Sequence, residues 1–233
     1  MTLSRRVVSE AVGTALLVAA VVGSGIMGER LSGGNVAIAL LANTLATGAT
    51  LVALILTFGP ISGAHLNPAV TLAEAWQRGI DWRHVPSYIA SQCAGAFAGL
   101  VSAHLMFGEP LLVPSQHARS GGAQFFSEFV ATFGLLGVVF GCARLRPPAV
   151  PFAVGAYITG AYWFTSSTSF ANPAVTLARA FTNTFAGIRP ADAPAFIAAQ
   201  LLGAGSATLL FSWLIPSSSS DAKSSECGSS DVK

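Results

Sequence analysis

The chain has 233 residues, of which 52% are hydrophobic and only 9% are charged. A soluble globular domain carries roughly 25% charged residues, so this composition indicates a lipid bilayer as the surrounding medium. The net charge of +2, with histidines neutral, is too small to suggest nucleic acid as a partner. Three cysteines, Cys93, Cys142 and Cys227, have no metal-ligand spacing and cannot form a disulfide framework, and we expect no metal site and no cofactor.

Six segments are long and apolar enough to cross a bilayer, which takes about 20 mostly apolar residues. The first follows two arginines and therefore resembles part of a signal peptide, but its near-spanning length, its internal Glu10 and the spans that follow predict a retained helix. We expect an all-α membrane protein with a disordered, Ser-rich polar tail at 216–233. The predicted spans lie at 7–27, 36–58, 86–107, 124–143, 149–168 and 192–215.

Two further segments are too short to span, and both hold the same motif. Residues 67–76 read NPAVTLAEAW and residues 172–181 read NPAVTLARAF, with eight of ten positions identical. Asn is a favoured N-cap and Pro is favoured at the first helical position, so both copies predict half-length helices, at 67–77 and 172–182. Irregular backbone at membrane depth is tolerated only where protein covers it or where it lines a wet cavity. The motif residues are Asn67, Pro68, Ala69, Asn172, Pro173 and Ala174.

The repetition extends beyond these motifs. Glu10 in the first span matches Glu128 in the fourth, and the Gln-x-x-Gly that begins at Gln92 matches one that begins at Gln200. Each half therefore holds three spans and one half-helix, and an odd number of spans makes the second half enter the membrane from the opposite side. Inverted repeats with discontinuous helices are a known transport architecture. We expect a first repeat at 1–115 and an inverted second repeat at 116–215, with the two helix starts meeting near the membrane centre.

The basic residues near the spans predict the orientation. With both termini inside, eight Lys and Arg residues lie on the cytoplasmic side and four lie outside. We therefore expect a multi-pass protein of the inner (plasma) membrane with cytoplasmic N- and C-termini. The inner set is Arg5, Arg6, Arg78, Arg83, Arg144, Arg146, Lys223 and Lys233, and the outer set is Arg30, Arg119, Arg179 and Arg189.

Asn67 and Asn172 are the first candidate functional residues. If each side-chain oxygen caps its half-helix, the NH₂ group is left to point into a lumen and to hydrogen-bond a passing neutral solute. Each half-helix also places the positive end of its dipole there, and such ends at the centre of a narrow pore repel cations and protons.

Glu10 and Glu128 are the acids that lie well inside spanning segments, where a carboxylate is costly and is a functional candidate by default. They could bind a coupling proton in a transporter, or accept hydrogen bonds from backbone N–H groups of the segments that dip into the membrane before each half-helix. Their symmetric placement favours the second role. His65 lies two residues before Asn67, and either lines the pore or stabilises the loop.

At these residues the chain resembles the aquaporin family, the major intrinsic proteins, from Glu10 to about Ile215. The markers are SGAHLNPAVT, the second NPA, the paired glutamates and the paired Gln-x-x-Gly. The resemblance implies six tilted helices and two half-helices around one pore per subunit, and usually a homotetramer.

The family lines an outer constriction with four positions, and carried over by their distance from the NPA asparagines they fall on Thr47, Gly160, Ser169 and Val175. Water-selective relatives usually have an aromatic residue, a His and an Arg here, and glycerol channels have aromatic residues, a Gly and an Arg. This sequence departs from both, since Val175 stands where the family usually has arginine. Arg179 lies one turn further on, where a contact between helices or at the interface is favoured over a position in the pore. We therefore expect a wide mouth without fixed positive charge.

These departures predict a passive channel for small uncharged solutes: glycerol-like polyols, metalloid hydroxides and also water. NPAV is similar to bacterial aquaglyceroporin-like channels found with arsenic-resistance genes, which suggests arsenite or methylated arsenicals as solutes. A proton- or ion-coupled secondary transporter of inverted-repeat fold and a plain water channel remain alternatives. The chain has no nucleophile–base or metal constellation, so we do not expect an enzyme.

Overall fold

The computed structural model describes residues 1–215, and in this part of the chain all regular structure is helical. The all-α prediction is confirmed, while the predicted disordered tail at 216–233 lies outside the described residues. The elements are α1 (Leu3–Leu31), α2 (Val36–Ser62), α3 (Pro68–Trp76), the 3₁₀ helix η1 (Trp82–His84), α4 (Val85–Phe107), α5 (Gly122–Leu145), the 3₁₀ helix η2 (Pro147–Ala149), α6 (Val150–Phe164), α7 (Pro173–Arg179) and α8 (Ala193–Leu214).

The long helices are the predicted membrane spans. By length and composition, α1, α2, α4 together with η1, α5 and α8 can each cross a membrane. The helix α6 is shorter, at 15 residues, because the predicted span at 149–168 stops being helical after Phe164 and continues as an irregular segment toward α7. The short helices α3 and α7 are the two predicted half-helices, so the architecture of six spanning helices and two half-helices is confirmed.

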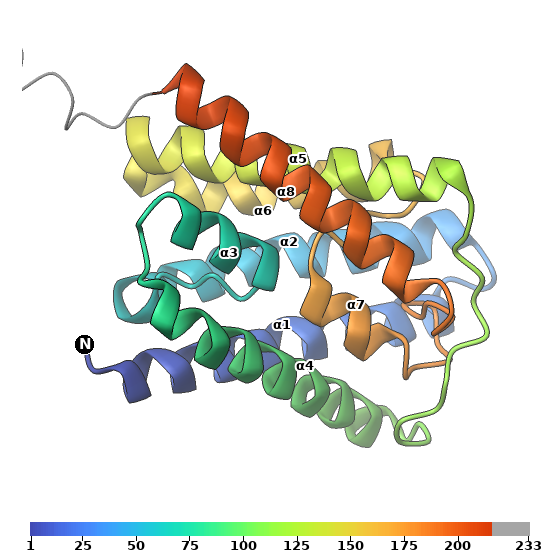
Figure 1. Ribbon diagram of the computed structural model, residues 1–233. Coiled ribbons are helices and arrows are strands. Elements are labelled where there is room, and N and C mark those ends of the chain that lie inside the picture. Colours follow the sequence, from blue (N-terminus) through green and yellow to red (C-terminus); the bar gives the residue numbers. More distant parts are fainter. Residues whose placement is uncertain (216–233) are drawn as a thin grey trace, which may run out of the picture.

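The two repeats form one bundle (Figure 1). In the first repeat α1 packs against α2 and α4, in the second α5 packs against α6 and α8, and α2 contacts α6 between the repeats. Half-helix α3 runs from the middle toward the end of the bundle where α1 begins and α8 ends, which we call the terminal end. Half-helix α7 runs toward the opposite end, which holds the 108–121 connection and is called the loop end.

Glycines allow the closest helix pairs to approach. A Cβ at Gly95 on α4 would overlap the backbone carbonyl oxygen of Ala11 on α1, and one at Gly203 on α8 would overlap the carbonyl oxygen of Phe129 on α5. These two glycines are the equivalent positions of the Gln-x-x-Gly repeats. Small residues at membrane helix crossings let the backbones come into van der Waals contact, which is the main attraction available between helices in lipid.

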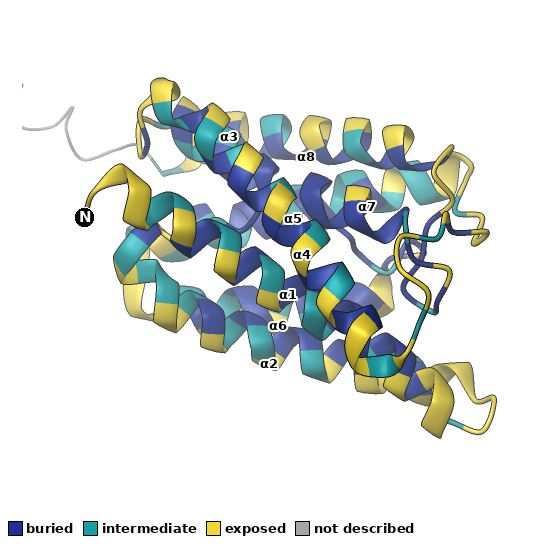
Figure 2. Ribbon diagram, turned by 90° about the horizontal axis from the view of Figure 1, so that it is seen from below, coloured by how far each residue is buried: buried dark blue, intermediate teal, exposed yellow. Residues whose placement is uncertain are grey.

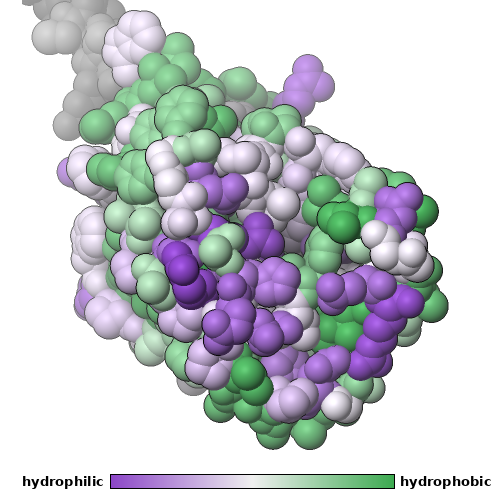
Figure 3. Space-filling view, turned by 90° about the vertical axis from the view of Figure 1, so that its right-hand side faces the viewer, coloured by the Kyte–Doolittle hydropathy of each residue, from purple (hydrophilic) through white to green (hydrophobic). Residues whose placement is uncertain are grey.

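The outer surface of the bundle is apolar along its flanks and polar at its loop end. Exposed residues follow the outward faces of the helices (Figure 2) and include Leu45, Phe152, Trp163 and Leu209. At the loop end, hydrophilic residues gather over the face, with hydrophobic residues at its margin (Figure 3). This distribution suits a protein whose flanks contact lipid and whose ends contact water.

Candidate functional site

The segments that precede α3 and α7 share an unusual backbone. Ala64 and Leu66 lie three residues and one residue before Asn67, and their φ angles are 47° and 49°. Ser169 and Ala171 lie at the same distances before Asn172, with φ angles of 50° and 48°. Non-glycine residues rarely adopt this left-handed region, so both dipping loops need outside support.

Glu10 supplies that support in the first repeat. Its carboxylate is fully buried and accepts hydrogen bonds from the backbone N–H groups of His65 (3.0 Å) and Leu66 (2.6 Å). The Ser62 hydroxyl (2.6 Å) and the Gln92 amide (2.8 Å) donate to it as well. All its contacts are with groups that hold the loop in place.

Glu128 repeats this arrangement in the second half. Its two oxygens accept from the backbone N–H groups of Phe170 (2.8 Å) and Ala171 (2.9 Å), and the Gln200 amide donates at 2.6 Å. These are the contacts of a structural acceptor, the role that the symmetric placement favours. A coupling proton on either carboxylate would remove acceptors from backbone N–H groups that are buried.

A threonine in each NPAVT sequence completes the network, and sequence reasoning missed it. Gln92 donates a second hydrogen bond to the Thr71 hydroxyl, which itself donates to the carbonyl oxygen of Asn67. Gln200 and Thr176 make the same pair of bonds toward Asn172. Both copies of the motif have a threonine at this position, and that repetition was the signal by which the sequence could have identified it.

The two asparagines meet where the half-helices begin. Each side-chain oxygen caps its own helix, Asn67 by accepting from Ala69 N–H (2.9 Å) and Asn172 from Ala174 N–H (3.0 Å). Each NH₂ group crosses to the other repeat: Asn67 donates to the carbonyl oxygen of Ala171 (2.7 Å) and Asn172 to that of Leu66 (2.8 Å). The expectation that each NH₂ group is left to point into a lumen therefore needs a correction, since one hydrogen of each joins the repeats and one remains.

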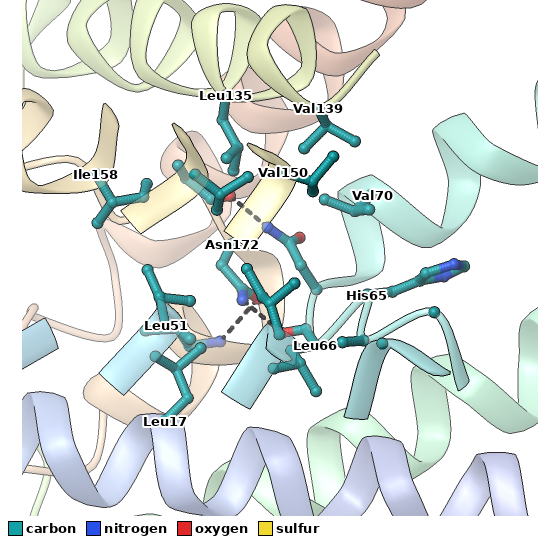
Figure 4. Close-up of a pocket in the computed structure, with 18 of the residues that line it drawn as sticks. Leu17, Leu51, His65, Leu66, Val70, Leu135, Val139, Val150, Ile158 and Asn172 are labelled. Atoms are coloured by element: carbon teal, nitrogen blue, oxygen red, sulfur yellow. Dashed lines mark hydrogen bonds between the residues drawn. The ribbon is translucent and has the colours of Figure 1, made fainter. Parts of the chain in front are cut away.

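A cavity of about 560 Å³ runs between the two repeats past this junction. Figure 4 shows its apolar wall and the dashed bonds that cross between the asparagines and the loops. Residues at the terminal end, among them Arg6 and Glu74, and residues nearer the loop end, among them Phe170 and Arg179, line the same cavity. Both asparagines line it too.

His65 lines the cavity on the terminal side of the asparagines (Figure 4). Its ring nitrogen Nδ1 lies 3.1 Å from the Thr71 hydroxyl, and its ring is tilted against Tyr88 with centroids 5.3 Å apart. Its backbone N–H bonds Glu10. The two roles considered from the sequence, lining the cavity and stabilising the loop, are compatible in this geometry.

Three of the four expected constriction residues line the cavity: Thr47, Ser169 and Val175. Gly160 does not, because it lies on the exposed side of α6, and the expectation for this residue was wrong. Tyr162, two residues later, lines the cavity instead, and its hydroxyl lies 3.4 Å from the Thr47 hydroxyl.

The helical period explains the correction on α6. Val150, Val154, Ile158 and Tyr162 recur every four residues and form one stripe along the cavity. Counting residues back from Asn172 fails because the 165–171 segment is not helical. The apolar spacing along α6 was the signal that could have identified Tyr162.

Arg179 also reaches the cavity, although a contact between helices was the favoured expectation. Its side chain is 2% exposed and its guanidinium carbon lies 3.3 Å from the centroid of the Phe170 ring. Its Nε donates to the carbonyl oxygen of Ala186.

Within residues 1–215, no group of three or more His, Cys, Asp or Glu side chains is placed to hold a metal ion.

A model of the major intrinsic protein family matches residues 1–147. The chain belongs to the major intrinsic protein family. This member is 56% identical over 213 residues to "Aquaglyceroporin AqpS" of Rhizobium meliloti (strain 1021), a match that covers 91% of each chain. It is 36% identical over 168 residues to "Aquaporin NIP3-1" of Oryza sativa subsp. japonica, covering 68% of this chain and 52% of the plant protein.

Its fold also matches a solved member of the family. The X-ray structure of the aquaglyceroporin from Plasmodium falciparum superposes with a TM-score of 0.73 at 21% identity, covering 92% of this chain and 98% of that one. In this major intrinsic protein the half-helices begin at the centre with their N-termini facing each other, as the odd number of spans in each repeat predicted. Each N-terminus carries roughly half an elementary positive charge, so the field is positive at the junction.

Proposed function

We propose that this major intrinsic protein is a passive channel for small uncharged polyols and metalloid hydroxides across the plasma membrane, with the terminal end in the cytoplasm. The observation that carries the proposal is one cavity that is lined by both NPA asparagines and by Val175, an uncharged residue at the position where the family usually has arginine. The count of basic residues supports the orientation.

The constriction offers two kinds of surface to a solute. Hydroxyl groups come from Thr47, Ser169 and Tyr162, and the Ser169 oxygen is buried without a hydrogen-bond partner within the described residues. Apolar surface comes from Ile158 and Val175. A polyol has hydroxyl groups along one side and carbon along the other, so it matches both surfaces at once, as small-ligand sites generally require.

Tyr162 changes what the constriction is expected to admit. A mouth lined by Gly, Thr, Ser and Val would be wide, whereas a tyrosine ring narrows it and adds a hydroxyl. The proposal therefore favours compact solutes with several hydroxyls, of the size of glycerol or As(OH)₃, over long polyols. The Rhizobium relative is named an aquaglyceroporin, which supports polyol passage. Arsenite is supported by the NPAV motif and by the chemistry of As(OH)₃, which is neutral and hydroxylated like a polyol.

Stopped-flow light scattering of proteoliposomes tests the proposal. Vesicles containing the full chain are mixed with an osmotic excess of glycerol or arsenite, and the rate of reswelling reports solute entry. We expect reswelling to be faster than in protein-free vesicles. The shrinkage that precedes it should also be faster than in protein-free vesicles, which would show that water passes. Reswelling at the protein-free rate for every solute would refute the channel assignment.

A channel also equilibrates without accumulating. Since Glu10 and Glu128 are occupied by backbone donors, we expect no coupling to a proton gradient. Radiolabelled glycerol should reach the same internal concentration with or without an imposed pH or sodium gradient. Accumulation above the external concentration would instead support a secondary transporter.

A further inference from the structure

The two copies of the ten-residue motif differ at a charged position. The eighth residue is Glu74 in the first copy and Arg179 in the second. Both residues line the cavity, and because α3 and α7 run in opposite directions they lie on opposite sides of the asparagine junction. Equivalent positions of the two repeats thus bring opposite charges to the two ends of the pore.

Arg179 is the more constrained of the two. Phe170 lies under its guanidinium, and Glu128 holds the backbone of Phe170 through a 2.8 Å hydrogen bond. The 184–188 segment closes around the arginine, through the Ala186 carbonyl that accepts from Nε and through the Ile188 N–H that donates to the Arg179 carbonyl at 3.2 Å. These contacts fix the guanidinium without neutralising it.

Within residues 1–215 no carboxylate lies within salt-bridge distance of Arg179. Its two terminal nitrogens make no hydrogen bond to protein in that part of the chain, so they are available to water or solute in the cavity. A charge at membrane depth without an ion pair is costly and marks a functional position. Arg119, which also lies near the Phe170 ring, differs because it bonds the carbonyl oxygens of Gly187 and Ser167 and does not line the cavity.

We propose that Arg179 supplies, from one helical turn beyond Val175, the fixed positive charge that excludes cations and protons from the outer part of this pore. This proposal rests on the channel function proposed above. A cation that enters from the loop end meets the guanidinium before it reaches the positive half-helix ends, so two barriers act in series. The charge is set back from the constriction, which leaves the space beside Val175 open to uncharged solutes.

The test measures proton leak and glycerol flux on the same vesicles. Proteoliposomes of the full chain contain a pH-sensitive dye, and a potassium gradient with valinomycin drives protons inward. We expect Arg179→Gln to raise proton leak about tenfold over the unmodified chain, because one nearby unit charge is lost from a low-dielectric site. Glycerol flux should stay within about twofold of that of the unmodified chain. The melting temperature in detergent should stay within a few degrees, because the packing around the aliphatic stem is kept.

Three variants separate this role from a structural one. Arg179→Lys should restore the low proton leak, because it keeps the charge. Glu74→Gln, at the equivalent position of the other repeat, should not raise the leak. Arg179→Met keeps the stem on Phe170 and replaces Arg179→Gln should the latter fail to give a monodisperse protein.

A low proton leak in Arg179→Gln or Arg179→Met, with glycerol flux unchanged, would overturn the proposal, and so would an equal leak in Glu74→Gln. The two proposals can fail separately. An unmodified chain that passes no glycerol, but whose Arg179→Gln variant leaks protons, removes the solute assignment and keeps the charge assignment.

Discussion

Tyr162 is the cavity-lining residue that differs most from the expected constriction. Its hydroxyl donates a 3.4 Å hydrogen bond to the Thr47 hydroxyl, while Gly160 lies on the exposed side of the same helix. We expect Tyr162→Ala to raise the permeability to polyols longer than glycerol by about tenfold, because the proposed constriction loses an aromatic ring. Stopped-flow reswelling in a series of polyols of increasing length measures the effect.

Gly160→Ala is the matched control for that experiment. A Cβ at Gly160 would meet no atom within 4 Å, so the substitution should leave all polyol fluxes unchanged. A change of selectivity in the Gly160 variant, with none in the Tyr162 variant, would restore the original assignment and contradict the geometry of α6.

Val175→Arg should restrict large solutes more than water. The valine is 4% exposed and lines the cavity beside the Asn172 cap, so a guanidinium there fills space that a polyol needs. We expect glycerol and arsenite fluxes to fall about tenfold while osmotic water flux falls by less than half that factor. Val175→Leu controls for volume without charge, and equal losses of water and glycerol flux would place Val175 away from the constriction.

At the scale of elements, the dipping loops depend on the buried glutamates. Glu128→Gln replaces one accepting oxygen by an NH₂ group that faces a backbone N–H, and this should destabilise the protein by about 2 kcal/mol. Thermal unfolding in detergent measures the loss. Glu10→Gln should behave alike because it makes the equivalent contacts, and a variant as stable as the unmodified chain would show that the loop does not depend on the carboxylate.

The helix pair α5–α8 offers a matched pair of glycines. Gly203→Ala places a Cβ against the Phe129 carbonyl oxygen, and overpacking of this kind costs about 1–3 kcal/mol. Gly205→Ala, two residues along the same helix, meets open space and should stabilise the helix by about 0.5–1 kcal/mol. Melting temperatures that shift in opposite directions would agree with the crossing geometry, and equal shifts would contradict it.

For the whole molecule, the family resemblance implies a homotetramer, and this remains a prediction. Light scattering of the detergent-solubilised protein, corrected for bound detergent, should give about four chains per particle. One pore per subunit then predicts that glycerol flux scales with the number of chains and not with their association. A monodisperse monomer with full flux would contradict the tetramer and leave the channel proposal intact.

Much of the fold could be predicted from the sequence because its signals are local and repeated. Apolar runs of spanning length, the Asn-Pro helix starts and the matched glutamates each have a direct physical meaning, and their duplication forces the inverted arrangement. Positions that depend on an irregular segment could not be predicted. Gly160 was assigned by counting across 165–171, and Arg179 was set aside because a sequence does not show which way a long side chain turns.

The crossed bonds between Asn67 and Ala171, and between Asn172 and Leu66, make each repeat incomplete without the other. A first repeat in the membrane before the second has been synthesised holds an amide and a carbonyl with no partner at the depth where water is scarce. We therefore expect a late step in folding in which the two loops form these crossed bonds together. Two fragments divided in the 108–121 connection should for the same reason conduct only when they are produced together, and neither should do so alone.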